Sequence, residues 1–464
     1  MTRSRPTASG VKLHVERNRE ALWAIPTRWC WTEVNEVGVV ALGRQRSPKD
    51  HHGPMMRPYV RAANITWDGW SLDDVKDMNF DETEFEQFRL HNGDVLLNEG
   101  SGSAQEVGKP AIWREQIPNC CFQNTLLRVR PLACTSEYMH QFFLHSALTG
   151  RFVSSTQGVN IFHIGKLGLA EFPIAVPPLP EQRRIVAKID SLSNKSKRAR
   201  EHLNHIPRLV EKYKQAVLAA AYESACRLAR EMTTLGQTAV EVRNGLSKKP
   251  SDSAQGLPIL RISAVRTLSV RLDDIRYYPE TDVVPEGALL RNGDLLFTRY
   301  NGNPEFTAAC GLVSGLTRET TYPDKLIRVR LREVAEPHFV ELISASPQSR
   351  RWLAPNIKSA AGQHGISGAD LKRMPVPLPT LTEQKTIATR VSSAFAWIDR
   401  LASETTSACK LIDRLDQAVL AKAFRGDLVP QDPNDEPAGA LLERIKNERQ
   451  GGSVAPSRRR TKMG

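Results

Sequence analysis

The chain has 464 residues, of which 40% are hydrophobic and 25% are charged, so the composition excludes a disordered or fibrous protein. This length fills two or three cores of ordinary size rather than one. Its 64 lysines and arginines exceed its 51 acidic residues by 13, and this surplus favours a polyanionic partner, because each phosphate contact releases condensed counterions.

The cysteines and the apolar runs bear on the cellular compartment. The seven cysteines are scattered and form no Cys-x-x-Cys pair, which indicates buried thiols in a reducing cytosol rather than a disulfide framework or a zinc knuckle. The longest apolar run, near 216–222, is much shorter than the roughly 18 residues that a membrane span needs. No apolar segment follows Arg3 and Arg5 as it would in a signal peptide. We therefore expect a soluble, cytoplasmic protein.

The sequence repeats itself at a distance of about 200 residues. Three landmarks recur at a shift of 200: PYVRAANI at 58–65 and PILRISAV at 258–265, NGDVLL at 92–97 and NGDLLF at 292–297, and LLRVR at 126–130 and LIRVR at 326–330. Three more follow in the same order: PLP at 178–180 and 377–379, EQ at 181–182 and 383–384, and QAVLA at 215–219 and 417–421. Agreement at six successive landmarks indicates an internal duplication.

In chain order, each half predicts a globular domain followed by a long helix. The landmarks of the globular parts are Val-, Ile- and Leu-rich runs bounded by Gly, Asn, Pro or Asp, as in buried strands next to tight turns. Helices are expected near 136–148 and 338–352, so the fold class is α+β with two similar domains. The expected segments are an N-terminal segment at 1–27, a first domain at 28–180, a first long helix at 181–232, a second domain at 233–379, a second long helix at 380–426, and a C-terminal helix with a basic tail at 427–464.

The two long helices carry matched apolar seams. Glu181 follows Pro180 at the first helix start, and Thr380 with Glu383 forms a capping box at the second. Below each start, apolar residues recur at alternating steps of four and three, the pattern by which helices pair. The main seam residues are Ile185, Ile189, Leu192, Leu203, Ile206 and Val210 in the first helix, and Ile387, Val391, Ile398, Leu401, Ile412 and Leu415 in the second.

Both helices have the same length between their landmarks, because 215 − 181 and 417 − 383 are both 34. At a rise of 1.5 Å per residue, this length spans about 50 Å. We expect the helices to pair antiparallel as a coiled-coil spacer with the two domains at opposite ends. Pro207 should kink or split the first helix. The alternative is that each amphipathic helix packs on its own domain.

The sequence contains near misses to catalytic motifs but no complete one. The Asn-Pro-Glu-Phe of 303–306 resembles the Asn-Pro-Pro-aromatic loop of amino-methyltransferases, but Glu305 replaces the second proline and no glycine-rich cofactor loop accompanies it. The Gly-Lys-Pro of 108–110 lacks the spacing of a phosphate-binding loop, and the histidine pair at 51–52 lacks metal-ligand spacing. We therefore expect no catalytic residue and no metal site in this chain.

The order of the helix motifs resembles that of a known family. PLPEQ at 178–182 opens the first long helix, EQ recurs at 383–384, QAVLAKAFRGDLVP ends the second helix at 417–430, and a tail follows at 432–445. Over almost the whole chain, these motifs resemble the specificity (S) subunits of type I restriction–modification systems. The sequence departs from the pattern at 222–226, where the first helix lacks the glycine-containing stop of the second.

The resemblance implies a DNA-binding subunit that is not catalytic on its own. Two target-recognition domains would each read one half of a split site in double-stranded DNA. The helices would set the gap between the half-sites and dock two modification (methyltransferase) subunits. Restriction (translocase/nuclease) subunits would join them, so that the complex would be a DNA adenine methyltransferase and an ATP-dependent endonuclease. S-adenosylmethionine, ATP and Mg²⁺ would be bound by these partners and not by this chain.

Polar and basic side chains in loops beside the landmarks are the candidate DNA contacts. In the first domain they are Arg44, Gln45, Arg46, Lys49, Ser101, Ser103, Gln105, Gln157 and Asn160. In the second domain they are Lys248, Lys249, Arg299, Asn301, Asn303, Gln363 and His364. The two sets differ, as expected if each domain reads different bases. The alternative is that they are ordinary solvated loop residues.

Three other functions stay open on the sequence. One is the specificity subunit of a methylation-only or orphan system. Another is a stand-alone nuclease or methyltransferase with an unrecognised site, which activity of the purified chain with Mg²⁺ or S-adenosylmethionine would favour. The third is a two-headed protein-interaction scaffold, which absent or sequence-independent DNA binding would favour.

Overall fold

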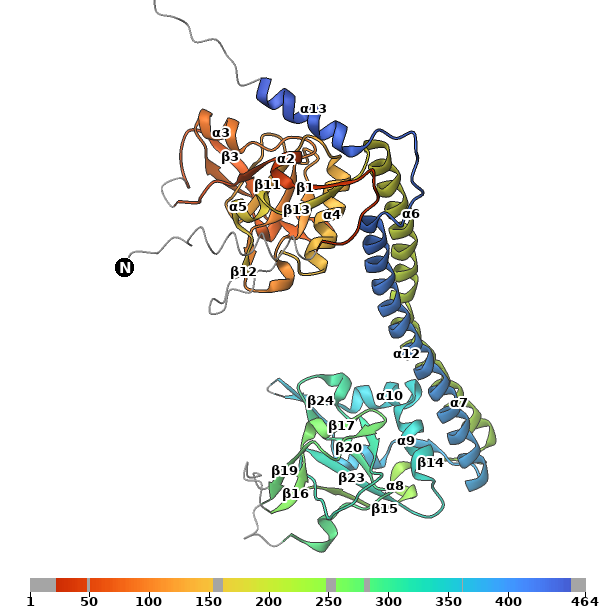
Figure 1. The fold of residues 1–464 in the computed structure, drawn as a ribbon. Helices are drawn as coiled ribbons and strands as arrows, with labels where there is room; N and C mark the ends of the chain where they lie inside the picture. The colour runs from red at the N-terminus through yellow and green to blue at the C-terminus, as the bar shows by residue number, and fades with distance from the viewer. Residues whose placement is uncertain are drawn as a thin grey trace, which may run out of the picture. The chain divides into compact units, whose positions relative to one another are not determined.

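The structure of the chain is a computed structural model that describes residues 22–47, 51–152, 162–247, 256–278, 284–360 and 362–451. Two compact units make up the chain (Figure 1). The first comprises Met1–Glu201 with Cys409–Gly464, and the second comprises His202–Ala408. The division passes through the long helices, so each unit contains one globular domain and a part of both helical segments. Both units contain strands and helices, which confirms a mixed fold.

A four-stranded antiparallel sheet is the centre of the first unit. In spatial order its strands are β2 (Gly38–Leu42), β11 (Leu126–Pro131), β7 (Val95–Asn98) and β9 (Pro110–Ile112). Shorter ladders surround it: β1 (Cys30–Glu33) with β13 (Pro173–Val176), β8 (Gly100–Ser101) with β12 (Phe162–His163), β4 (Ile65–Thr66) with β5 (Gly69–Trp70), and β3 (Met56–Val60) between β6 (Lys76–Asn79) and β10 (Cys121–Phe122).

The strand β7, which the NGDVLL landmark opens, is buried on both faces of the sheet. Val95 and Leu97 lie in one core with α4 (Ser136–Leu148), and Leu96 lies in another core with Phe122. Successive side chains of a strand point to opposite faces, so a strand that is buried on both sides is apolar at successive positions.

The helices of the first unit lie around this sheet. The helices and 3-10 turns are α2 (Val34–Val37), η2 (Ala62–Asn64), α3 (Glu82–Phe88), η3 (Ala104–Glu106), α4, α5 (Gly165–Ala170), α6 (Leu179–Asn204) up to Glu201, the end of α12 (Leu381–Arg425) from Cys409, and α13 (Ala438–Gly451). The expected helix at 136–148 is confirmed by α4.

The second unit has the same central sheet. In spatial order its strands are β15 (Ala239–Asn244), β23 (Leu326–Leu331), β20 (Leu295–Thr298) and β22 (Cys310–Leu312). Leu296 pairs with Arg328 here as Leu96 pairs with Arg128 in the first unit, so the strand register repeats at the 200-residue shift of the sequence.

The remaining elements of the second unit are short ladders and helices. The ladders are β14 (Met232–Thr234) with β26 (Pro375–Pro377), β16 (Leu257–Leu260) with β19 (Ile275–Tyr278), β17 (Val265–Arg266) with β18 (Ser269–Val270), and β21 (Tyr300–Asn301), β25 (Gln363–Gly365) and β24 (Lys358–Ala360) in that order. The helices and turns are α7 (Ile206–Leu228), α8 (Leu235–Thr238), η4 (Ile262–Ala264), η5 (Glu286–Ala288), η6 (Pro304–Phe306), α9 (Pro337–Ala345), α10 (Pro347–Leu353), η7 (Ala354–Asn356), α11 (Gly368–Lys372) and α12 up to Ala408.

Prolines divide two helices that the sequence pattern joins. The helix expected at 338–352 is two helices, α9 and α10, because Ser346 precedes Pro347 and is extended (φ −64°, ψ 151°). The hydroxyl of Ser346 then accepts a hydrogen bond from Ser349 N at the start of α10. Likewise α6 ends at Asn204 and α7 begins at Ile206, so the split expected at Pro207 is confirmed.

A glutamine ties the start of each long helix to its domain. Gln384 Oε1 accepts Glu336 N (2.8 Å), and its Nε2 donates to Pro379 O (2.8 Å) and Val334 O (2.9 Å). Gln182 Oε1 accepts Thr135 N (2.9 Å) in the same way. These contacts explain why a glutamine recurs at the start of both long helices.

The long helices pair antiparallel within each unit (Figure 1). In the first unit, Ile185 and Ile189 of α6 share a core with Phe424 near the end of α12, and Arg200 donates to Asp413 (2.9 Å) farther along both helices. In the second unit, the apolar face of α7 packs on the start of α12. Its core members there are Leu218, Ala221 and Ala225 of α7 and Ile387, Ala388 and Val391 of α12.

The contact stripe of α12 departs from the expected seam at two leucines. Leu401 and Leu415 are exposed (37% and 55%), although Val391 and Ile398 are buried as expected. The expected positions 387, 391, 394, 398, 405, 408, 412 and 419 are buried or half-buried, and so are 388, 395, 402, 409, 416 and 423, which lie one residue beyond one line of the seam. The sequence pattern favours the large leucines at 401 and 415, but the side chains that the paired helices enclose at 402 and 409 are a small alanine and a cysteine.

The other expected seam residues lie within the described part of the chain. Ile185, Ile189 and Ile387 are buried. Half-buried positions are Leu192, Leu203, Ile206, Val210 and Ile412. Among the described helices, none combines the length and the apolar character that crossing a bilayer requires.

Candidate nucleic-acid interface

One end of the central sheet gathers candidate residues of the first unit. The register pairs Leu42 with Leu127 and Asn98 with Leu126, so the ends of β2 and β7 meet the start of β11. Backbone hydrogen bonds then hold the following loops together, Asn124 N to Arg44 O (3.0 Å) and Glu99 N to Thr125 O (2.9 Å). Two of the expected DNA-contact loops, those after β2 and β7, therefore begin side by side.

The second unit repeats this arrangement. Asp324 N donates to Leu246 O (2.7 Å), and Arg299 N donates to Lys325 O (2.8 Å). Three segments therefore lie at the same end of the sheet: the loop after β15, the loop after β20 and the turn before β23. Lys248 and Lys249, expected DNA contacts in the first of these loops, lie outside the described residues, as do Lys49, Gln157, Asn160 and the basic tail.

Short strands bring further candidates to this end of the sheet. Asn301 of β21 pairs with His364 of β25, whose strand also contains Gln363. In the first unit, Ser101 of β8 pairs with Phe162 of β12 at the corresponding place. Residues that lie 61 to 63 positions apart in the sequence are therefore neighbours in both units.

The loops after these strands have the same turn in both units. Asn303 N donates to Asn301 Oδ1 (2.9 Å), and Ser103 N donates to Ser101 Oγ (3.1 Å). Each turn leads into a 3-10 helix, η6 or η3, and η3 contains Gln105. The backbone of the loop is conserved between the units while its side chains differ.

An open cavity of about 490 Å³ lies beside the second unit's candidates. Its lining residues are Arg299, Tyr300, Lys358, Gln363, Gly365, Ile366, Ser367 and Asp370. The guanidinium of Arg299 lies 4.8 Å from the ring centre of Tyr300, and Lys325 Nζ lies 5.0 Å from the same ring. Two cations on one aromatic side chain give this end of the sheet a positive, π-rich surface suited to bases and phosphates.

Arg44 has a structural position that the sequence did not predict. Its Nε donates to Glu84 Oε1 (2.7 Å), its guanidinium lies 5.1 Å from the ring centre of Phe80, and its side chain is only 12% exposed. A guanidinium engaged in this way holds α3 against the sheet and does not extend toward a ligand. Gln45 and Arg46 are exposed next to it, and Arg46 Nε donates to His51 Nε2 (2.9 Å).

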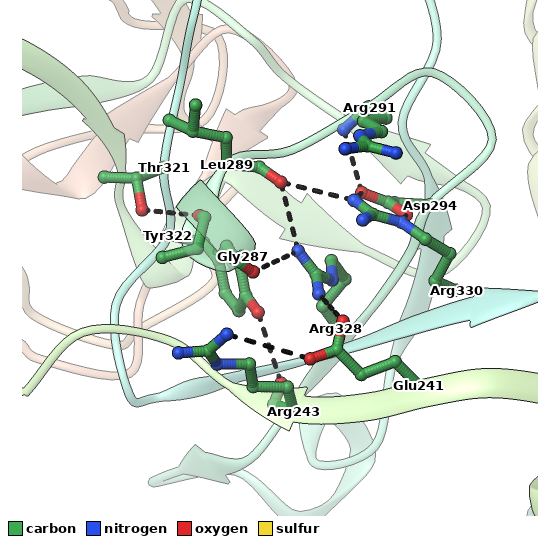
Figure 2. A network of polar contacts seen from close by, with 11 residues as sticks. Glu241, Arg243, Gly287, Leu289, Arg291, Asp294, Thr321, Tyr322, Arg328 and Arg330 are labelled. Carbon is green, nitrogen blue, oxygen red and sulfur yellow. Dashed lines mark hydrogen bonds and ion pairs between the residues drawn. The ribbon is translucent and has the colours of Figure 1, made fainter. Parts of the chain in front are cut away.

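Buried arginines hold the segment that precedes the second strand of the central sheet, as Figure 2 shows for the second unit. Arg328 is fully buried, donates to Gly287 O (2.8 Å) and Leu289 O (3.0 Å), and forms an ion pair with Glu241. Because a buried guanidinium needs partners for its N–H groups, these carbonyls hold the segment before β20 on the sheet. The alternating arginines of LIRVR mark this network in the sequence, but their role becomes visible only in the structure.

The first unit has the same network with one partner fewer. Arg128 donates to Arg89 O (3.1 Å), and burial lowers its pKa. The position of Glu241, paired across the strands with Arg330, corresponds to Val39, which pairs with Arg130. The two units therefore share the hydrogen bonds from the buried arginine to backbone carbonyls, whereas the ion pair with Glu241 belongs to the second unit.

A serine–histidine–glutamate contact joins α9 to α12 in the second unit. His338 Nε2 lies 2.9 Å from Ser392 Oγ, and its Nδ1 lies 3.0 Å from Glu341 Oε2, which raises the pKa of His338. Glu341 also accepts Leu312 N (2.7 Å). Ser392 lies in the interior of α12, where backbone N–H groups bond within the helix and are not available as oxyanion donors. This contact therefore ties the domain to the helix, and the sequence pattern did not predict it.

The described residues contain no group of three or more His, Cys, Asp or Glu side chains that could hold a metal ion. The described thiols at the sheet and in the core have raised pKa values because of burial, about 12 for both Cys120 and Cys121. These thiols are protonated at neutral pH and are poor nucleophiles.

Comparisons with known proteins agree with this architecture. Residues 28–208 match the family profile described as the type I restriction modification DNA specificity domain. The type I restriction enzyme EcoKI specificity subunit of Escherichia coli (strain K12) is 34% identical over 414 residues, which cover 84% of this chain and 88% of that protein. The StySPI specificity subunit of Salmonella potsdam is 27% identical over 448 residues, covering 92% and 96% of the two chains.

Solved structures show the same fold. The HsdS subunit from Thermoanaerobacter tengcongensis matches with a TM-score of 0.56 and 19% identity, covering 88% of this chain and 99% of that one. A chain from a study of complex assembly and conformational transition of the type I R-M system matches with a TM-score of 0.61 and 18% identity, covering 88% and 100%. The chain belongs to the family of type I restriction enzyme specificity subunits.

Proposed function

We propose that each unit reads one half of a bipartite site in double-stranded DNA through the loop end of its central sheet. The observation that carries this proposal is a duplicated backbone frame with different side chains. Ser101 and Ser103 make the same turn as Asn301 and Asn303, but present different hydrogen-bonding groups. Two frames with different polar surfaces suit two different base sequences, because the major groove presents a distinct donor and acceptor pattern for each base pair.

The charge of the chain supports a duplex ligand. The net charge of +13 favours phosphate contacts, which position a protein on DNA without selecting sequence. The cations at 299, 325 and 358 lie around the cavity end of the second unit. Base contacts from the loops would then add the sequence preference.

The long helices would set the distance between the half-sites as a coiled-coil spacer. The helix α12 has 45 residues without a break, which is about 68 Å at 1.5 Å per residue. In each unit this helix packs antiparallel on the other helical segment. A helix pair shared by both units is a suitable ruler, because its length is fixed by backbone hydrogen bonds.

The partners would be two methyltransferase subunits docked on α12, with restriction subunits joining that core in the cytoplasm. Large apolar side chains on α12 are exposed, Trp397 (64%) in the second unit and Leu411 (62%) in the first. Exposed apolar side chains of this size favour a protein contact. S-adenosylmethionine, ATP and Mg²⁺ would be bound by those subunits, and this chain would have no catalytic role of its own.

Methylome sequencing tests the proposal. A host that contains this chain and its methyltransferase partner should carry adenine methylation at one two-part motif, and deletion of this chain should remove the whole motif. Methylation that persists without the chain would contradict a specificity role. Methylation or cleavage by the purified chain alone would favour a stand-alone enzyme.

A second assay distinguishes a restricting from a methylation-only system. Unmodified phage DNA that contains the motif should be restricted only if restriction subunits join the complex. Either outcome leaves the DNA-recognition role of this chain unchanged. It decides whether the chain directs methylation alone or both methylation and restriction.

A further inference from the structure

Residues 99 and 299 occupy the same place in the two units but carry opposite charge. Each directly follows the strand that the Asn-Gly-Asp landmark opens, and 299 − 99 is the 200-residue repeat shift. Glu99 N donates to Thr125 O (2.9 Å) and Glu99 O accepts Ile164 N (2.9 Å). Arg299 N donates to Lys325 O (2.8 Å) and Arg299 O accepts Ile366 N (3.0 Å). The backbone of each residue is therefore held by two neighbours at corresponding positions in its own unit.

The frame around position 299 orients the guanidinium. Arg299 is half-buried in the wall of the open cavity, its ring contact with Tyr300 is 4.8 Å long, and its Nη1 donates to Asp324 O (3.3 Å). Stacking and one carbonyl contact fix the plane of the group. Its Nε is buried without a hydrogen-bond partner among the described residues, whereas the residue itself lines the cavity, so a ligand there would meet the outer part of the guanidinium.

Glu99 occupies the position in the first unit that is equivalent to Arg299, but its side chain has the opposite charge. The residue is half-buried, and burial raises its pKa, while His163 opposes this shift. A partly desolvated carboxylate gains free energy from hydrogen-bond donors and is repelled by phosphates. A site that faces DNA with such a group is therefore suited to a base edge with an amino group rather than to the backbone.

We propose that positions 99 and 299 are equivalent base-reading positions, with Arg299 selecting guanine in the second half-site and Glu99 selecting a base with an exocyclic amino group in the first. Arginine matches the O6 and N7 acceptors of guanine, and a carboxylate accepts from the N4 amino group of cytosine. The N6 amino group of adenine offers the same donor chemistry, so the motif itself decides between the two bases. This inference rests on the proposed function, in which the loop end of each sheet faces DNA.

The test uses the full chain with its methyltransferase partner and reads the methylated motif of each variant genome-wide. Arg299→Gln should relax the guanine at one position of the second half-site or change it to adenine, which glutamine recognises. Glu99→Gln should relax one position of the first half-site. In each case, discrimination at that position should fall by about tenfold or more, and the other half-site should stay unchanged. Arg318→Gln and Glu86→Gln are matched controls, since both residues are exposed, and they should leave the motif as it is.

The outcomes separate this inference from the proposed function. A wild-type complex without any bipartite motif would contradict the proposed function itself. A wild-type complex with a bipartite motif that neither variant changes would overturn the base-reading role alone. Uniformly weaker binding of Arg299→Gln to all sequences, with a smaller salt dependence, would also overturn it, because that result marks a phosphate contact.

Discussion

Arg330 holds the buried carboxylate of Asp294 by two hydrogen bonds, from Nε and Nη2, each 2.8 Å long. Arg130 and Asp94 form the same pair in the first unit, at 2.7 and 2.9 Å. In both units the arginine lies on a strand, β11 or β23, that starts at the proposed DNA-facing end of the sheet. The aspartate lies in the Asn-Gly-Asp turn before the neighbouring strand, β7 or β20, at the opposite end of the sheet. The pair therefore ties this turn to the strand beside it. The hydrogen bonds raise the pKa of both arginines, so both stay charged and paired.

Removal of the buried carboxylate should destabilise the second unit. Asp294→Ala should lower the free energy of unfolding by about 3 kcal/mol, because the partly buried Arg330 loses its charge partner. Urea denaturation of the full chain measures the change. The exposed Asp273 provides the control, since Asp273→Ala should change the free energy by less than about 0.5 kcal/mol. Equal losses in both variants would contradict a stabilising role for the pair.

Two desolvated histidines, the buried His145 and the half-buried His140, should make the first unit sensitive to acid. Burial lowers the pKa of His140 and His145 to about 4, from an ordinary value of 6.5. Between these values the unfolded chain binds protons that the folded chain does not, so the free energy of unfolding should fall as the pH falls from 6.5 toward 4. Each group contributes a loss on the order of 3 kcal/mol over this range, since one unit of pKa corresponds to about 1.4 kcal/mol.

His145→Phe isolates one of these contributions. The ring of His145 lies 5.3 Å from that of Phe424 and 6.1 Å from that of Trp23, so an aromatic replacement keeps the packing. The variant should lose less stability than the parent between pH 6.5 and 4, as measured by thermal unfolding across that range. The exposed His52 serves as control, and His52→Phe should keep the acid sensitivity of the parent. An unchanged slope in His145→Phe would refute the assignment.

The exposed tryptophan of α12 should matter for assembly and not for folding. Trp397→Ala should weaken binding of the methyltransferase partner by at least about tenfold, because a buried tryptophan at an interface contributes about 2 kcal/mol or more. Its 64% exposure predicts little change in unfolding free energy. Calorimetric titration with the partner gives the affinity, and Arg400→Ala, one turn away and also exposed, is the control. If both variants bind as the parent does, α12 does not dock the partner at this place.

The sequence predicted the features that local chemistry and repetition determine. The duplicated strands, the helix starts at Glu-Gln and the break at Pro207 follow from residue patterns that act over a few positions. The seam register was missed at Leu401, because burial depends on which face the paired helix covers and not on hydrophobicity alone. Arg44 and the contact of His338 with Ser392 could not be predicted, since their partners are 40 and 54 residues away in the sequence. The DNA-contact residues stay a prediction.

Lengthening the helices should change the gap in the DNA site and nothing else. Four residues inserted into α12 after Thr406, together with four inserted into α6 after Arg198, add about 6 Å at 1.5 Å per residue. This length is close to two base pairs at 3.4 Å each, so the methylated motif should keep both half-sites while its gap grows by about two base pairs. The same four residues inserted after Thr317, in the loop between β22 and β23, should leave the gap unchanged. A motif whose half-sites change, or whose gap is the same in all three chains, would show that the helices do not set the spacing.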